Sequence, residues 1–415
     1  MINFERFKLH NGLKVILQKD VTTPMVTVNV LYDVGSRDEH SEKTGFAHLF
    51  EHLMFGGTPR FPDYDKIAQK AGATNNAFTS NDLTNYYISL PASNLETGLM
   101  LEADRMAGLL FSSESLEVQR KVVIEEFKQR YLNKPYGDVW LELSPLAYLS
   151  HPYAWPTIGK EIKHIEDANL DDVRSFFAKH YNTKNATLSV VGNIDIDLVK
   201  NQIEKWFGTL NGGVVYRREL SSEPFQTKKR KLKLLREVPH NAIYKVFHMP
   251  DRLSSEFYSG DLVSDLIGRG YSSWIYKQLV SEKRLFTSAS ASVSGSMDPG
   301  LFILSGMLSP GIEFEQAEVA LDEIINNVKT GEILDVELDK IKNKVESTLL
   351  FGNIKHTDKA FHLAWFELLG DANWINEEVS RYREVSVELI RNFAKEHLND
   401  DQSSVLYYSS KIKAN

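Results

Sequence analysis

Residues 45–58 read Gly45-Phe46-Ala47-His48-Leu49-Phe50-Glu51-His52-Leu53-Met54-Phe55-Gly56-Gly57-Thr58. If this stretch is helical, His48 and His52 lie one turn apart on one face, where a single Zn²⁺ can bind both imidazoles. Glu51 then lies beside the metal, where its carboxylate could take a proton from a zinc-bound water. The order His-x-x-Glu-His is the reverse of the H-E-x-x-H zinc motif and is itself a catalytic signature.

An ordinary pair of helical histidines is the alternative. This composition produces His-x-x-Glu-His by chance in roughly a few per cent of chains of this length. The neighbouring residues favour the metal site, because apolar side chains surround the polar trio: Phe46, Ala47, Leu49, Phe50, Leu53 and Met54. Buried imidazoles and a buried carboxylate need partners, and a metal ion supplies one. The sequence therefore predicts a zinc site on a buried helix.

Length and composition are those of an ordinary globular protein. With 415 residues, 42% hydrophobic and 25% charged, the chain can bury a large core and is expected to hold two domains. The net charge of −8 argues against a nucleic-acid partner. No run of about 18 apolar residues predicts a membrane span, and residues 1–8 lack the apolar core of a signal peptide. We therefore expect a cytoplasmic location. The absence of cysteine excludes thiolate zinc ligands.

Two strand-like segments precede the motif. Leu9–Leu17 and the β-branched run Met25–Tyr32 predict a hairpin within residues 9–34. A loop over residues 34–39 follows, and Thr44 is a candidate N-cap for the motif helix. The motif helix is thus expected to follow a central strand.

The segment after the motif predicts a short helix at Tyr64–Lys70 and then an edge strand. Residues 72–90 are rich in small, hydroxyl and β-forming residues without a continuous apolar run, which is typical of an edge strand that turns into a hairpin. An exposed edge near a zinc ion can pair with an extended peptide by strand addition. The other interpretation is a plain polar hairpin.

Two further helices are predicted at about Leu95–Phe111 and Ser115–Leu132. In the second, Val118, Val122 and either Glu125 or Glu126 recur at helical spacing, so one of these acids can face inward with the apolar stripe. A catalytic zinc with two histidines needs a third protein ligand and leaves the fourth position for water. Other acids of this region fit solvated helix faces better: Glu102, Asp104, Glu114 and Glu117.

Three patterns together carry a family resemblance: Gly45-x-x-His48-x-x-Glu51-His52-x-x-Phe55-x-Gly57-Thr58, Asn76-Ala77-x-Thr79-x-x-Asp82-x-Thr84-x-Tyr86, and Arg120-x-Val122-Val123-Ile124-x-Glu126. The chain resembles the pitrilysin/insulinase family of inverted-zincin metallopeptidases, in particular the two-domain branch that includes the β-subunit of mitochondrial processing peptidase and bacterial relatives. In that family two histidines and a downstream glutamate bind zinc, and the motif glutamate is the base.

The resemblance implies a role for matched residues of this chain. His48, His52 and Glu126 would be the zinc ligands and Glu51 the catalytic base; Glu126 is preferred to Glu125 because it closes the Arg-x-Val-Val-Ile stretch. The edge strand that holds the substrate backbone in the family would be Asn76, Ala77, Phe78 and Thr79.

The C-terminal half looks like a copy of the first. Residues 173–182 (VRSFFAKHYN) parallel residues 390–399 (IRNFAKEHLN), 217 positions apart, and a strand follows each. The same offset sends His48 and His52 to Asp265 and Arg269, so one zinc ion per chain is expected. The predicted fold is α+β, with two similar tandem domains, each a mostly antiparallel sheet packed by helices. Their bounds would be 1–210, a zinc-binding catalytic domain, and 228–415, joined by a linker at 211–227.

The second half also indicates whether the active site needs residues from another subunit. In relatives that act as single catalytic units, the second domain supplies an arginine and a tyrosine, seven residues apart, that bind the substrate carbonyl. In the matching segment, residues 270–287, Val280 and Thr287 stand at those positions, and a gap brings only Phe286, which has no hydroxyl, to the tyrosine position. Such a group is worth about 10²–10³ in rate. We therefore expect a related subunit to supply it in a heterodimer, with a homodimer as the alternative.

The predicted function is a zinc-dependent endopeptidase that hydrolyses extended or unfolded peptides. The alternative is a non-catalytic assembly subunit of the same fold. The intact set of ligands and base argues against a scaffold, since a scaffold has no need of Glu51. Four histidines lack metal-ligand spacing and are expected to be structural: His240, His248, His356 and His362.

Overall fold

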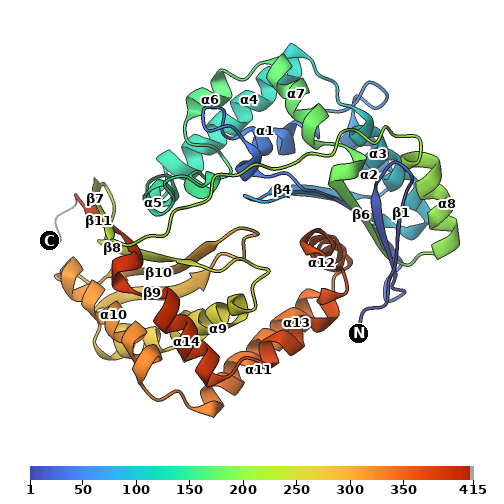
Figure 1. The fold of residues 1–415 in the computed structure, drawn as a ribbon. Helices are drawn as coiled ribbons and strands as arrows, with labels where there is room; N and C mark the ends of the chain where they lie inside the picture. Colours follow the sequence, from blue (N-terminus) through green and yellow to red (C-terminus); the bar gives the residue numbers. More distant parts are fainter. Residues whose placement is uncertain (412–415) are drawn as a thin grey trace. The chain divides into compact units, whose positions relative to one another are not determined.

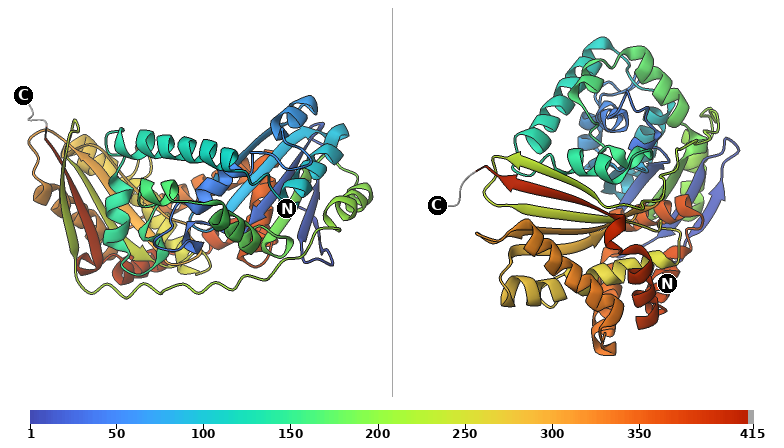
Figure 2. Two further views of the ribbon diagram at one scale, coloured as in Figure 1. Left: turned by 90° about the horizontal axis from the view of Figure 1, so that it is seen from above. Right: turned by 60° about the vertical axis from the view of Figure 1, so that its left-hand side comes forward.

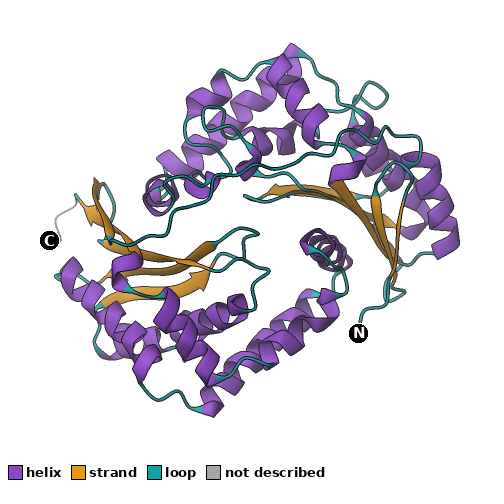
Figure 3. Cartoon of the chain, in the orientation of Figure 1, coloured by secondary structure: helices purple, strands orange, loops and turns teal. Residues whose placement is uncertain are grey.

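The computed structural model describes residues 1–411, which divide into two compact units. Unit 1 comprises Met1–Arg130, Trp155–Ser221 and Leu350–Glu377. Unit 2 comprises Tyr131–Ala154, Ser222–Leu349 and the described residues from Glu378 onward. Each unit is a sheet packed by helices (Figure 1, Figure 3).

Unit 1 is built on a six-stranded sheet with the order β1-β2-β6-β3-β5-β4. The strands are β1 (Glu5–Lys8), β2 (Lys14–Lys19), β3 (Met25–Tyr32), β4 (Thr74–Thr79), β5 (Thr84–Pro91) and β6 (Ala186–Gly192). Neighbours are antiparallel except β2 and β6, which are parallel. The predicted hairpin of residues 9–34 is therefore wrong, because β6 lies between β2 and β3. All seven residues of β6 are buried, and a fully buried strand needs a hydrogen-bonding partner on both sides.

Unit 2 has a five-stranded sheet with the order β7-β11-β8-β10-β9. The strands are β7 (Arg230–Arg236), β8 (Ala242–Met249), β9 (Phe286–Val293), β10 (Gly300–Leu308) and β11 (Ser403–Ser410). The late strand β11 lies between β7, its parallel neighbour, and β8, its antiparallel neighbour; it is the red strand of this sheet in Figure 2. β6 has the same place in unit 1, and β8 lies 217 residues after β3. The predicted fold class, mostly antiparallel sheets packed by helices, is confirmed.

The helices of the first half are α1 (Phe46–Leu53), α2 (Tyr64–Lys70), α3 (Leu95–Ala107), α4 (Ser113–Phe127), α5 (Val139–Ala147), α6 (Ile162–Glu166), α7 (Leu170–His180) and α8 (Ile196–Phe207). Those of the second are α9 (Glu256–Gly268), α10 (Phe314–Thr330), α11 (Asp335–Gly352), α12 (His356–Leu369), α13 (Trp374–Arg383) and α14 (Val387–His397). Among residues 1–411, two π-helical turns occur, η3 (Lys128–Leu132) and η6 (Ile275–Glu282). Among the described residues, none of the helices combines the length and apolar character that crossing a membrane requires.

Two equivalent helices are exchanged between the halves. α12, from the second half, packs on β6 and β3 of unit 1 (Figure 1), and α5, from the first half, packs on β11 and β7 of unit 2. The two helices begin 217 residues apart, at Val139 and His356. The units are therefore not the two halves of the chain. The bounds 1–210 and 228–415 describe homologous halves, and they stay a prediction.

The sheet faces under the two exchanged helices differ in chemistry. Under α12 the face is mixed: within the sheet the Asn85 amide donates to Asn29 Oδ1 at 2.8 Å, Ser189 Oγ donates to the Ala360 carbonyl of the helix at 2.7 Å, and Leu31 packs in one apolar cluster with Ala364. Under α5 the face is apolar, where Leu143 packs in one cluster with Val246 and Leu406. Both helices thus combine apolar packing with hydrogen bonds to the strands below them, and polar side chains are more prominent under α12.

Candidate metal centre and active site

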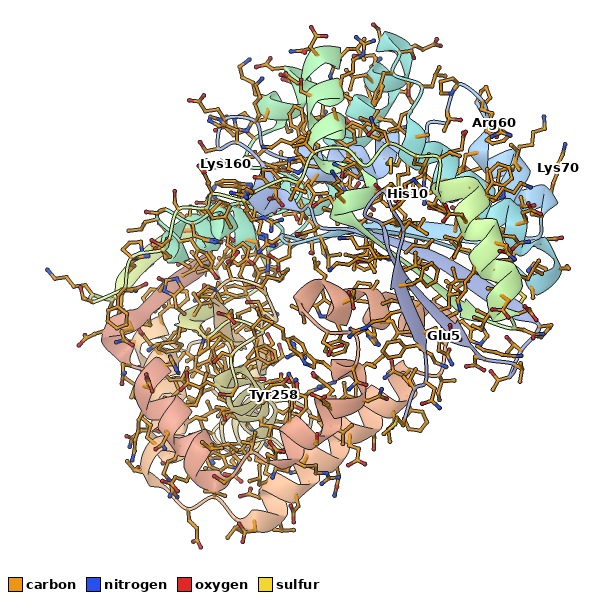
Figure 4. All side chains as sticks on the ribbon, turned by 45° about the vertical axis from the view of Figure 1, so that its right-hand side comes forward. Glu5, His10, Arg60, Lys70, Lys160 and Tyr258 are labelled. Atoms are coloured by element: carbon orange, nitrogen blue, oxygen red, sulfur yellow. The ribbon has the colours of Figure 1, made fainter. Side chains whose placement is uncertain are left out.

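Helix α1 carries the three motif residues and follows the interior strand β3. Its buried residues include Leu49 and Phe50, which are fully covered. The helix begins after Gly45, whose φ of +87° favours glycine and whose Cβ, if present, would lie 2.6 Å from the Ile158 carbonyl oxygen. Thr44 is not the N-cap, contrary to the prediction. Its hydroxyl instead contacts His164 Nδ1 at 2.8 Å and accepts the backbone N–H of Lys160, which Figure 4 labels.

Glu39 satisfies the first turn of α1 in place of Thr44. Its carboxylate accepts the N–H groups of Gly45 at 2.9 Å and Ala47 at 2.8 Å, and that of the Trp155 indole at 3.1 Å. Burial raises the pKa of Glu39 to about 8, although these hydrogen bonds act in the opposite direction. An acceptor at a helix N-terminus pairs its free N–H groups. Sequence reasoning missed Glu39, because local capping rules read the residue next to the helix and not one six positions before Gly45.

The predicted ligands come together. Glu126 Oε2 on α4 lies 3.6 Å from His48 Nε2 and 3.3 Å from His52 Nε2. A tetrahedral zinc ion with bonds of about 2.0–2.1 Å holds its ligand atoms about 3.3–3.4 Å apart. Two imidazoles and one carboxylate are also a donor set that zinc prefers. The three side chains therefore fit one zinc ion.

The protonation states of these groups suit metal binding. Burial lowers the pKa of His48, a shift that Glu126 opposes and His52 adds to. The contact with His52 lowers the pKa of Glu126 against the effect of burial. A neutral imidazole and an ionised carboxylate are the forms that bind a metal cation.

Glu126 rather than Glu125 faces the histidines. Glu125 is exposed and accepts Lys128 Nζ at 2.6 Å. The predicted inward stripe through Val118 and Val122 is wrong, because these two side chains are 52% and 44% exposed. The buried residues of α4 are Leu116, Val123 and Phe127. Glu126 lies beside this face, between the core and the surface.

Glu51 lies between the metal ligands and strand β4. Thr79 Oγ1 donates to Glu51 Oε2 at 2.7 Å. Burial raises the pKa of Glu51, while the Thr79 hydrogen bond and the charge of His52 lower it. The base candidate is therefore held against one residue of the predicted substrate strand.

Strand β4 is the edge of its sheet, which confirms the predicted edge hairpin with β5. Of the four residues predicted to hold substrate, Asn76 and Phe78 are exposed and Ala77 is buried. The Phe78 ring lies 5.1 Å from that of Phe361 on α12. Substrate binding by this strand remains a prediction.

In the part of the chain that the structure describes, the other groups of possible ligands do not combine two imidazoles with a carboxylate. In unit 2, Glu318, Asp322 and Asp400 lie close together, but Lys245 Nζ lies 2.5 Å from Asp322 and 2.6 Å from Asp400. Glu256, Glu396 and His397 form a further, largely exposed group. Within residues 1–411, the four histidines expected to be structural take part in none of these groups.

Comparison with known proteins gives the family. Residues 14–143 match the family model described as insulinase (peptidase family M16), and residues 167–345 match the model described as the peptidase M16 inactive domain. The chain belongs to the M16 peptidase family. Among its relatives, the zinc protease PqqE of Helicobacter pylori is 29% identical over 97% of this chain and 92% of that protein.

Further M16 relatives extend the comparison. The uncharacterized zinc protease YmxG of Bacillus subtilis is 25% identical over 97% of both proteins. The mitochondrial-processing peptidase subunit beta of Caenorhabditis elegans is 27% identical over 49% of this chain and 44% of that protein. A crystal structure of a protease from Helicobacter pylori superposes with a TM-score of 0.91 at 29% identity, covering 99% of this chain and all of the other.

Glu102, which the sequence analysis placed on a solvated face, forms a buried ion pair with Arg105. Glu102 is 1% exposed and accepts Arg105 Nε at 2.9 Å and the Tyr64 hydroxyl at 2.9 Å. The Arg105 guanidinium lies over the ring of Tyr86, 4.5 Å from its centroid. The prediction of a solvated face is therefore wrong for Glu102. Asp104 is half-buried and accepts the Thr58 hydroxyl. An acid and a base three residues apart resemble a surface pair in sequence.

Proposed function

We propose that this chain is a zinc-dependent endopeptidase that acts on extended or unfolded peptides. The observation that carries the proposal is the convergence of His48, His52 and Glu126 beside Glu51. Relatives named zinc proteases support the peptidase class. The name of the second family model, an inactive domain, fits a second half without a motif.

One zinc ion per chain would be held by His48, His52 and Glu126, and when bound it would polarise the scissile carbonyl and lower the pKa of a water molecule. Glu51 accepts the proton of the attacking water and returns it to the leaving amine. Thr79 holds one oxygen of Glu51, which limits the rotation of the carboxylate. Partial burial of Glu51 raises its pKa, which favours its role as a proton acceptor.

Strand β4 is the proposed docking edge for the substrate. A peptide that adds as a further strand pairs its backbone with residues 76–79 and comes alongside Glu51 through Thr79. Strand addition needs a free backbone. The proposed substrates are therefore extended or unfolded peptides rather than folded proteins.

The second half supports a partner subunit. Val280 is half-buried in η6, Thr287 is exposed on β9 and Phe286 is 1% exposed. None of the three can supply a guanidinium or a phenol. We propose that a related subunit supplies this pair in a heterodimer, with a homodimer as the alternative.

The cytoplasmic location likewise stays a proposal. The similar structure of PqqL from Escherichia coli is described as periplasmic. It has a TM-score of 0.82 at 17% identity and covers 99% of this chain and 48% of that protein.

The test is zinc content together with hydrolysis of a quenched unstructured peptide. We expect about one zinc per chain in both the wild type and Glu51→Gln, with hydrolysis lower by about 10²–10⁴-fold in the variant. Loss of zinc in Glu51→Gln would contradict the assignment of the base. A wild-type chain without zinc would favour the non-catalytic assembly subunit.

The same assay tests the partner. The wild-type chain alone should be weakly active, and addition of a related subunit with the arginine and tyrosine should raise the rate by about 10²–10³-fold. Full activity of the purified chain alone would contradict a divided active site.

A further inference from the structure

The two oxygens of Glu126 have different partners. Oε2 faces His48 and His52, whereas Oε1 forms an ion pair with Arg130 Nη1 at 2.9 Å. The Glu126 side chain is 16% exposed and that of Arg130 is 72% exposed. The guanidinium thus covers the outer oxygen of the carboxylate from the solvent side.

The backbone changes between the two residues. α4 ends at Phe127 and continues as the π-helical turn η3, Lys128–Leu132. Arg130 stands four positions after Glu126, in the middle of this turn. π turns are rare and are frequent at functional sites. The π-helical turn that carries Arg130 is therefore a second unusual feature of this ion pair, besides the covered carboxylate.

An ordinary surface ion pair is the alternative explanation. Exposed pairs contribute about 0–1 kcal/mol, and Lys128 with Glu125, in the same turn, is one of them, with both side chains exposed. Arg130 differs because its partner is mostly covered and is a candidate metal ligand. Its planar guanidinium can also fix the orientation of a carboxylate, which the point charge of a lysine does less well.

We propose that Arg130 is a positioning residue of the metal centre, which holds Glu126 Oε1 so that the carboxylate offers Oε2 to zinc. The inference rests on the proposed zinc site. Partners that orient a ligand in this way change metal affinity by about 10–100-fold when they are removed. Arg130 lies outside the family motifs that the sequence analysis matched.

The experiment compares Arg130→Gln with Lys128→Gln in the full-length chain. Both variants remove one positive charge from the same turn, but only the first charge contacts Glu126. The zinc dissociation constant is measured on metal-free protein by competition with a chromophoric chelator. We expect zinc binding about 10–100-fold weaker in Arg130→Gln, unchanged in Lys128→Gln and intermediate in Arg130→Lys.

Thermal unfolding of the metal-free proteins is the control for folding, and it should be the same in all of them because both positions are on the surface. Equal zinc affinity of Arg130→Gln and the wild type would overturn the inference while leaving the proposed function intact. Equal losses in Arg130→Gln and Lys128→Gln would assign the effect to net charge and would also overturn it. A wild-type chain that binds no zinc would overturn both proposals.

Discussion

In unit 1, helix α1 faces the edge strand β4 through functional side chains, whereas in unit 2 the matching helix α9 touches the edge strand β9 directly. The offset of 217 places Gly268 at the position of Glu51. A Cβ on Gly268 would lie 2.0 Å from the backbone nitrogen of Ala291 on β9. Glycine therefore removes the base and also lets the helix approach the strand too closely for a site.

The positions that match the candidate metal ligands also carry residues that do not form a zinc site. Asp265 and Arg269 stand where His48 and His52 do, and they pair with each other at 3.3 Å. Asn343, at the position of Glu126, accepts Arg383 Nη2 at 2.7 Å. Two copies of one topology can thus differ completely in chemistry, because side-chain reach at one helix and one edge strand decides whether a site exists.

The largest expected effect is at the third ligand. Glu126→Ala should reduce zinc from about one per chain to near zero and hydrolysis by about 10³-fold or more, because the metal contributes several kcal/mol to the transition state. The matched variant Asn343→Ala should keep zinc and activity. Metal analysis and the peptide assay check both. A Glu126→Ala protein that retains zinc and activity would remove the distinction between the two halves.

A smaller effect is expected at the contact of α9 with β9. Gly268→Ala should lower the unfolding free energy by about 1–3 kcal/mol, because the added methyl group meets backbone atoms that must shift. Gly295→Ala is the matched control, since its nearest neighbour would be Phe257 Cζ at 3.5 Å, and it should stay within about 0.5 kcal/mol of the wild type. Urea unfolding measures both. Equal stability of the two variants would mean that α9 and β9 are not in close contact.

A pH-dependent effect, small near neutral pH, concerns two matched histidines, His180 and His397. His180 is fully buried, and burial, with the charges of Lys179 and Arg218, lowers its pKa to about 3 from an ordinary value of 6.5. Below pH 6.5 the unfolded chain binds the proton more readily, so this group lowers the unfolding free energy by up to about 1.4 kcal/mol per pH unit as the pH falls from 6.5 toward 3.

His180→Phe should therefore be less sensitive to acid than the wild type, while His397→Phe should keep the contribution of His180. Urea unfolding between pH 4.5 and 7 measures the difference. If the unfolding free energy falls equally with decreasing pH in the wild type and in His180→Phe, the burial of His180 does not contribute to acid sensitivity.

The sequence predicted those features that depend on local pattern. The motif helix, the edge hairpin and the repeat at 217 residues were visible because each is encoded in a short segment. The position of β6 between β2 and β3 was not visible, since pairing between strands 154–173 residues apart leaves no pattern in either segment alone. The same limit hid Glu39, whose role depends on a loop that brings it back to Gly45.

The side-chain environments were predicted least well. Val118 and Val122 have apolar side chains at helical spacing, but Leu116, Val123 and Phe127 form the buried face because they are the ones that α1 and its neighbours cover. Glu102 and Arg105 look like a surface pair, and only the packing of Tyr64 and Tyr86 around them makes them a buried one. Which face of a helix is covered depends on the elements that pack against it. The spacing of apolar residues along the helix does not reveal those elements.

The exchange of α5 and α12 sets an order of events on the ribosome. The strands of unit 1 are complete once Gly192 is made, but helix α12, which packs on β3 and β6, ends at Leu369. At about 5–20 residues per second, that delay is roughly 9–35 seconds. In this interval the side chains of Asn29, Asn85 and Ser189 can bond to water. α5 is synthesised before the strands it covers. It is therefore available to pack on the apolar face of unit 2 as soon as β11 is complete.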